Sequence, residues 1–339
     1  MARNIVNEIR KATRRQFSAE DNIRIVMEAV EDYPGNLGEF EERFGSEDAC
    51  LLYLYQLRWP EGFVCPRCGC ERSWLVRFRD RFECAACGRQ TSPTAGTIFH
   101  GTRVPLHIWF RAMWWGTSQK SGASALGLQR ILGLGSYKTA WLMLHKLRRA
   151  MVRPGRDRLD GRVEVDEVFV GGHEEGIIGR NRSSDKQLGA IAAQEDGAGI
   201  GRIRMQCIPD AKARSLTAFL RGAVEPGSVV RTDGWPGYKS LPKEGYIREN
   251  AYIDREVLPR VHRVASLLKR WLLGTFHGAA SHEHLDEYLN EFTFRFNRRT
   301  SRSRGKLFYR LAQQAVAIDP VPYKAIIRPA KTRSRQPNR

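Results

Sequence analysis

Four cysteines in one short stretch constrain the fold of this chain more than any other feature. They form two C-x2-C pairs, Cys65 with Cys68 and Cys84 with Cys87, separated by fifteen residues. Glycine follows the second cysteine of each pair and allows the tight turn that leaves backbone N–H groups free to face the sulfurs. Four thiolates complete a tetrahedral Zn²⁺ shell with no open position, so the spacing predicts a structural zinc ribbon.

The remaining cysteines are expected to take no part in that site. Cys70 follows a ligand too closely and is interpreted as a bystander, while Cys50 and Cys207 are interpreted as small buried hydrophobic residues. Four of seven cysteines in one cluster favour metal binding in a reducing cytosol over a disulfide framework. A zinc ribbon in a basic chain usually contacts nucleic acid, and a role in protein packing alone is the alternative.

The charge of the chain points to its partner. Lysine and arginine outnumber aspartate and glutamate 56 to 37, which gives a formal net charge of +19 over 339 residues. Such a field attracts polyanions, so we expect DNA as the partner. No apolar run reaches the roughly 20 residues of a membrane span, and the start lacks the apolar core of a secretory signal. We therefore expect a cytoplasmic, nucleoid-associated protein.

Turn residues and changes in hydrophobic period divide the chain into five expected segments. We predict a basic helical segment over 1–45, the zinc ribbon over 46–98, a helical DNA-binding segment over 99–153, an α/β core over 158–300 and a basic tail over 301–339. The predicted class is therefore multidomain α+β.

The segment before the core has a helix-turn-helix pattern. A helix over 125–132 ends at a glycine, and Ser136 is expected to cap a second helix over 137–150. The second helix would present its first residues to a DNA groove, and the alternative is a helical hairpin that only packs. The residues expected to contact DNA, here and at the basic end of the core, are Arg130, Tyr137, Lys138, Trp141, Arg295, Arg298 and Arg299.

The core segment alternates strands with helices. The predicted strands span 162–170, 187–193, 201–208, 228–232 and 246–249, and the predicted helices span 211–224, 261–273 and 284–298. Three strands, helix, strand, helix, strand, helix is the order of the ribonuclease-H-like, retroviral-integrase-like fold with a mixed five-stranded sheet. In that fold the first and fourth strands lie side by side.

Two short β-branched runs at these strands, Val163–Asp166 and Val229–Asp233, each finish on an aspartate. Displacement at phosphorus builds charge on the attacking and leaving oxygens, and two Mg²⁺ ions about 4 Å apart, held by carboxylates, stabilise both. Either aspartate alone is more often a turn residue. In a chain this basic, the pair predicts a two-metal site that cuts or joins phosphodiesters.

The helix over 261–273 supplies a third candidate. Its apolar residues share one face, and His262, Ser266 and Lys269 share the other. Seven residues of helix separate His262 from Lys269 by roughly 10.5 Å, so one can reach a metal while the other holds a phosphate. The alternative for His262 is a solvated polar residue.

Several motifs resemble those of bacterial insertion-sequence transposases of the IS-1595 family, which join a zinc ribbon to an ISXO-type DDE transposase domain. The resemblance covers roughly residues 37–315 and rests on Arg58-Trp59-Pro60-Glu61-Gly62-Phe63, Tyr137-Lys138-Thr139-Ala140-Trp141, Val165-Asp166-Glu167, Thr232-Asp233-Gly234 and Glu291-Phe292-Thr293-Phe294-Arg295-Phe296-Asn297-Arg298. It implies strand cleavage and strand transfer at terminal inverted repeats, with Mg²⁺ or Mn²⁺, by a homo-oligomer assembled on DNA.

The same resemblance assigns roles within the site. Asp166 and Asp233 match the first two acids, His262 falls where the third acid precedes a lysine by seven, and Lys269 is that lysine. Imidazole suits Mn²⁺ better than Mg²⁺, and Glu256 is the alternative third acid. A non-catalytic DNA-binding regulator and a metal-dependent nuclease without strand transfer are the alternative functions.

Overall fold

The computed structural model describes residues 33–76, 80–153, 155–171, 187–251, 258–277 and 282–327. It divides into two compact units, one built from residues up to 154 together with 301–322, and the other from 155–300 with the C-terminal residues. Most of the predicted helical segment 1–45 lies outside the described residues.

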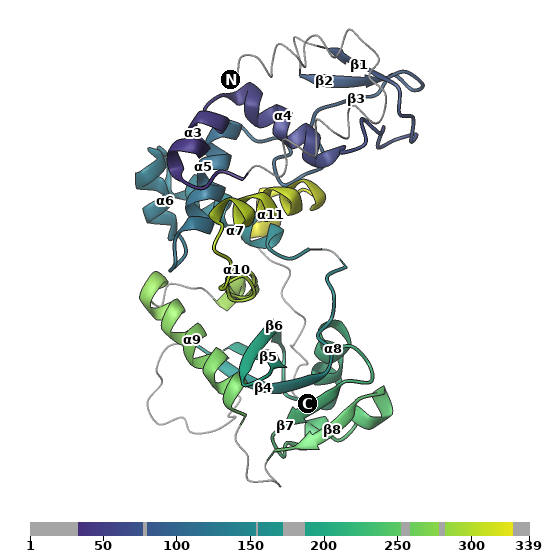
Figure 1. Ribbon diagram of the computed structural model, residues 1–339, viewed down its shortest axis with the longest axis vertical. Helices are drawn as coiled ribbons and strands as arrows, with labels where there is room; N and C mark the ends of the chain where they lie inside the picture. Colours follow the sequence, from purple (N-terminus) through teal and green to yellow (C-terminus); the bar gives the residue numbers. More distant parts are fainter. Residues whose placement is uncertain are drawn as a thin grey trace, which may run out of the picture. The chain divides into compact units, whose positions relative to one another are not determined.

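The first unit joins the three-stranded ribbon to a group of helices (Figure 1). In the ribbon, β1 pairs with β2 and β2 with β3, all antiparallel. The elements of this unit are α3 (Leu37–Phe44), α4 (Glu47–Arg58), β1 (Ser73–Val76), β2 (Arg81–Cys84), β3 (Gln90–Thr91), α5 (Leu106–Ser118), α6 (Ala125–Leu132), α7 (Tyr137–Ala150) and α11 (Arg304–Ala317).

Helix α11 corrects the expectation of a basic tail after residue 300. It packs against α4, α5 and α7, and its Phe308 is fully buried. The ring of Phe308 lies 5.3 Å from that of Phe40 and 5.6 Å from that of Phe110, centroid to centroid. Aromatic pairs at this spacing stabilise a core beyond their buried area, so the segment completes the first unit.

The second unit is a five-stranded mixed sheet in the order β6-β5-β4-β7-β8. Strands β4, β5 and β6 pair antiparallel, whereas β7 and β8 run parallel to β4. This topology confirms the predicted ribonuclease-H-like core, with the first and fourth strands adjacent. The strands are β4 (Arg162–Val170), β5 (Gln187–Asp196), β6 (Gly199–Ile208), β7 (Val229–Thr232) and β8 (Ile247–Asn250).

Helices cover both faces of this sheet, with α8 on one side and α9 on the other (Figure 1). Alternate residues of β4 explain the two layers, since Val163 and Val165 pack toward α8 while Val168 and Val170 pack toward α9 and α10. The helical elements of the unit are α8 (Ala213–Ala223), α9 (Pro259–Phe276), α10 (Leu285–Phe296) and α12 (Tyr323–Ile327), with 3₁₀ turns at Pro236–Tyr238, Leu241–Glu244 and His282–His284.

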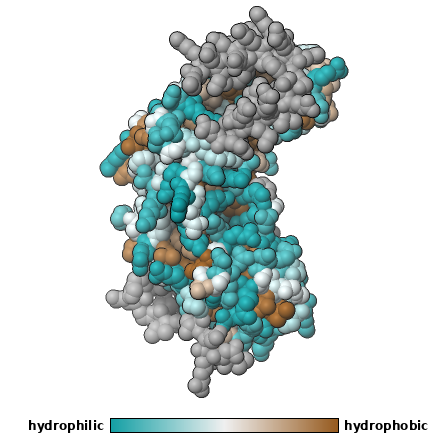
Figure 2. All heavy atoms as spheres, in the orientation of Figure 1, coloured by the Kyte–Doolittle hydropathy of each residue, from teal (hydrophilic) through white to brown (hydrophobic). Residues whose placement is uncertain are grey.

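The described surface is mostly polar on the face that Figure 2 draws. The hydrophobic residues of this face form small separate groups. Within the described ranges, every helix is too short or too polar to cross a bilayer.

Two cysteines outside the ribbon were expected to be buried, and they differ in how far they are. Cys50 is buried as expected, whereas Cys207 is only partly buried, against the core that α9 and α10 form with the sheet.

Candidate active site and zinc centre

The pairing of β4 with β7 relates the two candidate aspartates, although only one of them lies in a strand. Asp166 is in the middle of β4 rather than at its end, and Asp233 directly follows β7. The parallel register aligns Glu164 with Arg231, and each aspartate comes two residues later in the chain. Residues two apart point to the same face of a sheet, and neighbouring strands lie about 4.8 Å apart. Continued by two residues, the register pairs Asp166 with Asp233.

Local hydrogen bonds orient both carboxylates. Asp166 Oδ1 accepts from the backbone N–H of Glu167 at 2.8 Å, and Asp233 Oδ1 accepts from that of Trp235 at 3.1 Å. Asp233 thus begins a turn, as the structural alternative for it predicted. The turn does not exclude a role in metal binding, because a carboxylate has about four lone-pair positions.

The acids of this region affect the pKa of Tyr238. The residue is fully buried, and burial, followed by the charges of Glu167, Asp166 and Asp233, raises the pKa of its hydroxyl well above the usual value. Carboxylates from β4 and from the turn after β7 therefore act on the same hydroxyl. Tyr238 follows Asp233 in the motif on which the family resemblance rests, but nothing in its local sequence marks it as buried beside acids.

Helix α9 has the two faces that its sequence predicted. Val261, Val264 and Leu268 are buried against the sheet, whereas His262 and Lys269 are exposed. His262 Nε2 lies 3.4 Å from Asp166 Oδ2, with 54% of the histidine side chain and 19% of the aspartate side chain exposed. The third candidate therefore contacts the first.

Lys269 stands two helical turns beyond His262 on the same exposed face of α9. Glu256, the alternative third acid, lies outside the described residues.

The four ribbon cysteines meet the geometric requirement for zinc. The Sγ atoms of Cys65 and Cys87 are 3.7 Å apart, and those of Cys68 and Cys84 are 3.5 Å apart. A tetrahedral Zn²⁺ with Zn–S bonds of about 2.3 Å holds its sulfurs about 3.8 Å apart. The ribbon therefore forms a structural zinc site, and Cys70 lies outside it with its Sγ directed at the carbonyl of Arg72.

Backbone amides and neighbouring thiols both act on this cluster. Desolvation raises the pKa of Cys84, but hydrogen bonds from the N–H groups of Cys87 and Ala86 and from the thiols of Cys68 and Cys65 outweigh it and lower the pKa to about 6. The same contacts between thiols raise the pKa of Cys68, so the cluster shares its protons when no metal is bound. These amides come from the knuckle turn itself, where φ of Gly88 is +66°. Gly88 therefore allows the turn that presents these N–H groups, because a positive φ costs other residues free energy.

The segment with the helix-turn-helix pattern forms two packed helices, α6 and α7. Gly133 ends α6 in the left-handed conformation at φ +63°. Ser136 is the N-cap residue of α7 as predicted, but its side chain makes no capping hydrogen bond. Tyr137 and Lys138 are exposed at the start of α7 and Arg130 is exposed on α6, whereas Trp141 is half-buried.

The arginines expected to bind DNA at the end of the core have intramolecular partners instead. Arg295 pairs with Glu291 at 2.8 Å, and the guanidinium of Arg298 covers the ring of Phe294. Arg299 donates to the carbonyls of Ile200, Gly201 and Phe296. These contacts connect the end of α10 to β6 and to itself, which the charge pattern alone did not reveal.

We predict that replacing Cys68 with serine releases the zinc and unfolds the ribbon, because three thiolates no longer complete the shell. Metal analysis of the purified variant should find about one equivalent less zinc per chain. Cys70→Ser is the matched control and should keep the metal. Full zinc content in Cys68→Ser would show that the shell uses another ligand.

Two protein families match this chain. Residues 45–90 match the transposase zinc-ribbon domain, and residues 158–297 match the ISXO2-like transposase domain. The chain is also 29% identical over 278 residues to an uncharacterized protein in transposable element ISH50 of Halobacterium salinarum, which covers 74% of this chain and 91% of that protein.

Two solved structures are similar at a low level. One is the simian T-cell lymphotropic virus intasome in complex with PP2A regulatory subunit B56 gamma, at 12% identity and a TM-score of 0.31, covering 55% of this chain and 70% of that chain. The other is the Mos1 transposase paired-end complex with left transposon end, at 12% identity and a TM-score of 0.21, covering 56% and 76%. Both scores are low, so the strand order carries the fold assignment. The two family matches together span more than half of the sequence, and the chain belongs to the IS-1595-type insertion-sequence transposases, which act on DNA.

Proposed function

We propose that this transposase binds the terminal inverted repeats of its insertion sequence and uses two divalent metal ions to cut and join DNA strands. The observation that supports the proposal most directly is the 3.4 Å contact between His262 and Asp166. Asp233 directly follows β7, the strand that pairs in parallel with β4. The proposed site would therefore combine two carboxylates and an imidazole from parts of the chain that are far apart in sequence.

The donor set indicates how the site would be used. Asp166 and Asp233 would hold Mg²⁺ or Mn²⁺ through carboxylate oxygens, with His262 as the third ligand or as the partner of a bound water. When bound, the ions supply the positive charge that stabilises the attacking and leaving oxygens. Lys269 would hold a DNA phosphate farther along the strand, since its charged ammonium cannot ligate a metal.

Binding of the element ends would fall mainly to the first unit. Arg130, Tyr137 and Lys138 are exposed on α6 and α7, and the net charge of +19 favours association with DNA throughout. Homo-oligomeric assembly on DNA and a cytoplasmic, nucleoid-associated location belong to the same proposal. The arginines of α10 contribute less in this view, because their guanidinium groups already have partners.

We predict that Asp166→Asn or Asp233→Asn abolishes cleavage and strand transfer while binding of end DNA persists or tightens, because a negative charge facing phosphate is removed. The measurement is a strand-transfer assay alongside a DNA-binding titration. Asp196→Asn, at the exposed end of β5, is the control and should remain active. Cleavage by either site variant would refute the two-metal site.

The same assay on the unmodified protein separates the alternative functions. Cutting DNA without joining it would indicate a metal-dependent nuclease, and binding DNA without cutting it would indicate a regulator.

We predict that Mn²⁺ supports activity better than Mg²⁺, because imidazole suits the softer ion. His262→Glu restores an oxygen ligand and should keep or improve activity in Mg²⁺, whereas His262→Ala should be severely impaired in both metals. Strand transfer across titrations of each metal provides the measurement. Ser266→Ala, one turn further on the same exposed face, is the control. Unchanged activity of His262→Ala in both metals would make His262 a solvated helix residue.

We predict that replacing Arg130 and Lys138 together with alanine weakens end binding and lowers the slope of log K against log salt by about 2, roughly one for each lost phosphate contact. A titration at several salt concentrations measures the slope. Arg214 and Lys239, two exposed cations of the other unit, form the charge-matched control pair. An equal loss of DNA affinity in both double variants would mean that the affinity depends on net charge rather than on these two positions.

A further inference from the structure

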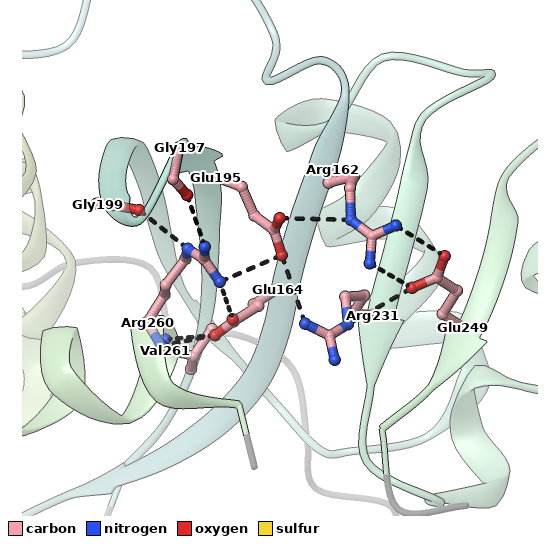
Figure 3. Close-up of polar contacts among 9 residues, drawn as sticks. All are labelled: Arg162, Glu164, Glu195, Gly197, Gly199, Arg231, Glu249, Arg260 and Val261. Atoms are coloured by element: carbon pink, nitrogen blue, oxygen red, sulfur yellow. Dashed lines mark hydrogen bonds and ion pairs between the residues drawn. The ribbon is translucent and has the colours of Figure 1, made fainter. Parts of the chain in front are cut away.

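Glu164 is a buried acid two residues before Asp166 on the same face of β4. Its side chain is fully buried, and it comes from a strand whose other buried residues toward α9 are valines. Its Oε2 accepts from the backbone N–H of Arg260 at 2.7 Å and from that of Val261 at 3.0 Å (Figure 3). The carboxylate therefore binds the first turn of α9 directly.

These two N–H groups are donors that the helix itself cannot satisfy. Helix α9 begins at Pro259, and the preceding Leu258 offers no side-chain acceptor and makes no capping bond. A cap residue normally accepts from the second or third N–H of its own helix. Here an acid on a neighbouring strand, 96 residues earlier in the chain, provides that function. The start of α9 is thus fixed to β4 rather than to its own connecting segment.

The side chain of Arg260 makes the attachment rigid. Its guanidinium donates to Glu164 Oε1 at 2.9 Å and to Glu195 at 3.3 Å. It also donates to the carbonyls of Gly197 and Gly199, each at 2.9 Å, in the turn between β5 and β6 (Figure 3). A planar group held in several directions permits little rotation of the helix end.

The charged contacts continue across the sheet beyond Arg260. Glu195 pairs with Arg162 at 3.3 Å and with Arg231 at 3.5 Å, and Glu249 pairs with the same two arginines at 2.8 Å and 3.5 Å. The row, which we call the charged row, consists of Glu164, Arg260, Glu195, Arg162, Arg231 and Glu249. It links the two strands that carry Asp166 and Asp233 with the helix that carries His262.

Stability alone does not account for the buried end of this row, where Glu164 meets Arg260. Ion pairs removed from water often contribute no more free energy of folding than apolar side chains of similar size, because desolvation offsets the attraction. What such pairs supply is a defined geometry. His262 directly follows Val261, whose N–H Glu164 holds, and Asp166 lies two residues from Glu164. Glu164 therefore connects the backbone next to His262 with the strand that carries Asp166.

We propose that Glu164 is a positioning residue of the metal site, which sets the distance between His262 and Asp166 by holding the first turn of α9 against β4. The inference rests on the proposed roles of His262 and Asp166. It adds one requirement to those roles. His262 reaches the site only while the buried carboxylate of Glu164 holds the start of α9 in place.

The first test compares Glu164→Gln with Glu249→Gln, which removes an acid of the same row that does not touch α9. Outer partners of metal ligands typically change metal affinity or activity by about 10- to 100-fold. We expect Glu164→Gln to raise by that factor the Mn²⁺ concentration for half-maximal strand transfer, and Glu249→Gln to stay close to the unmodified protein. Arg260→Lys keeps the charge but loses the planar fork, so it should shift in the same direction and carries the test if Glu164→Gln does not fold.

A double-variant comparison separates positioning from a general structural effect. Binding of Mn²⁺ is measured by electron paramagnetic resonance of the free ion, with Glu164→Gln introduced into the unmodified protein and into His262→Ala. If Glu164 acts through His262, its replacement weakens Mn²⁺ binding in the first background and has little further effect in the second. Equal loss in both backgrounds would overturn the proposal.

The same titration distinguishes this inference from the proposed function. Asp166→Asn should eliminate Mn²⁺ binding at the site, and unchanged binding in that variant would refute the metal site itself. Loss of binding in Asp166→Asn together with equal behaviour of Glu164→Gln and Glu249→Gln would refute only the positioning role.

Discussion

Parallel pairing between β4 and β7 is the interaction on which the candidate site depends. The ladder places Glu164 beside Arg231, and the same register, continued by two residues, pairs Asp166 with Asp233, which directly follows β7. A shift by one residue would turn one aspartate toward α8 and leave the other facing α9. The valines packed on each side of β4 oppose such a shift, because it would exchange their buried faces. The packing of the valines in the core therefore also fixes where the two carboxylates lie.

Much of this arrangement could be predicted from sequence, because it depends on local periodicity. The alternation in β4 and β7 and the 3.6-residue period of α9 give the strand and helix positions, and the known strand order gives the neighbours. The zinc ligands were equally accessible, since the spacing of Cys65, Cys68, Cys84 and Cys87 is a direct geometric requirement. In each case, the signal lies within a few residues of the feature that it predicts.

The features that sequence did not reveal all depend on contacts between distant residues. The bond from Arg260 to Glu164 joins residues 96 positions apart, and a glutamate in a strand gives no sign of the helix that it caps. Helix α11 was missed for a different reason. Its apolar residues Leu307, Phe308 and Leu311 have helical spacing, but the many flanking arginines suggested a solvated tail. Charge density describes what surrounds a segment and does not exclude one buried face.

The position of α11 also bears on how the chain is synthesised. The core of the first unit contains Phe308, which packs against rings from α3, α4 and α5, while residues 155–300 form a separate unit between the two parts of that core. Domains generally fold as they leave the ribosome, in order from the N-terminus. In this chain, residues 155–300 leave the ribosome completely before α11 is made, so the second unit is synthesised before the first unit can complete its core. A nascent chain that stops anywhere before α11 thus leaves the aromatic surface of α3, α4 and α5 without its last layer, and such a surface is a target for chaperones and proteases rather than a finished half of the protein.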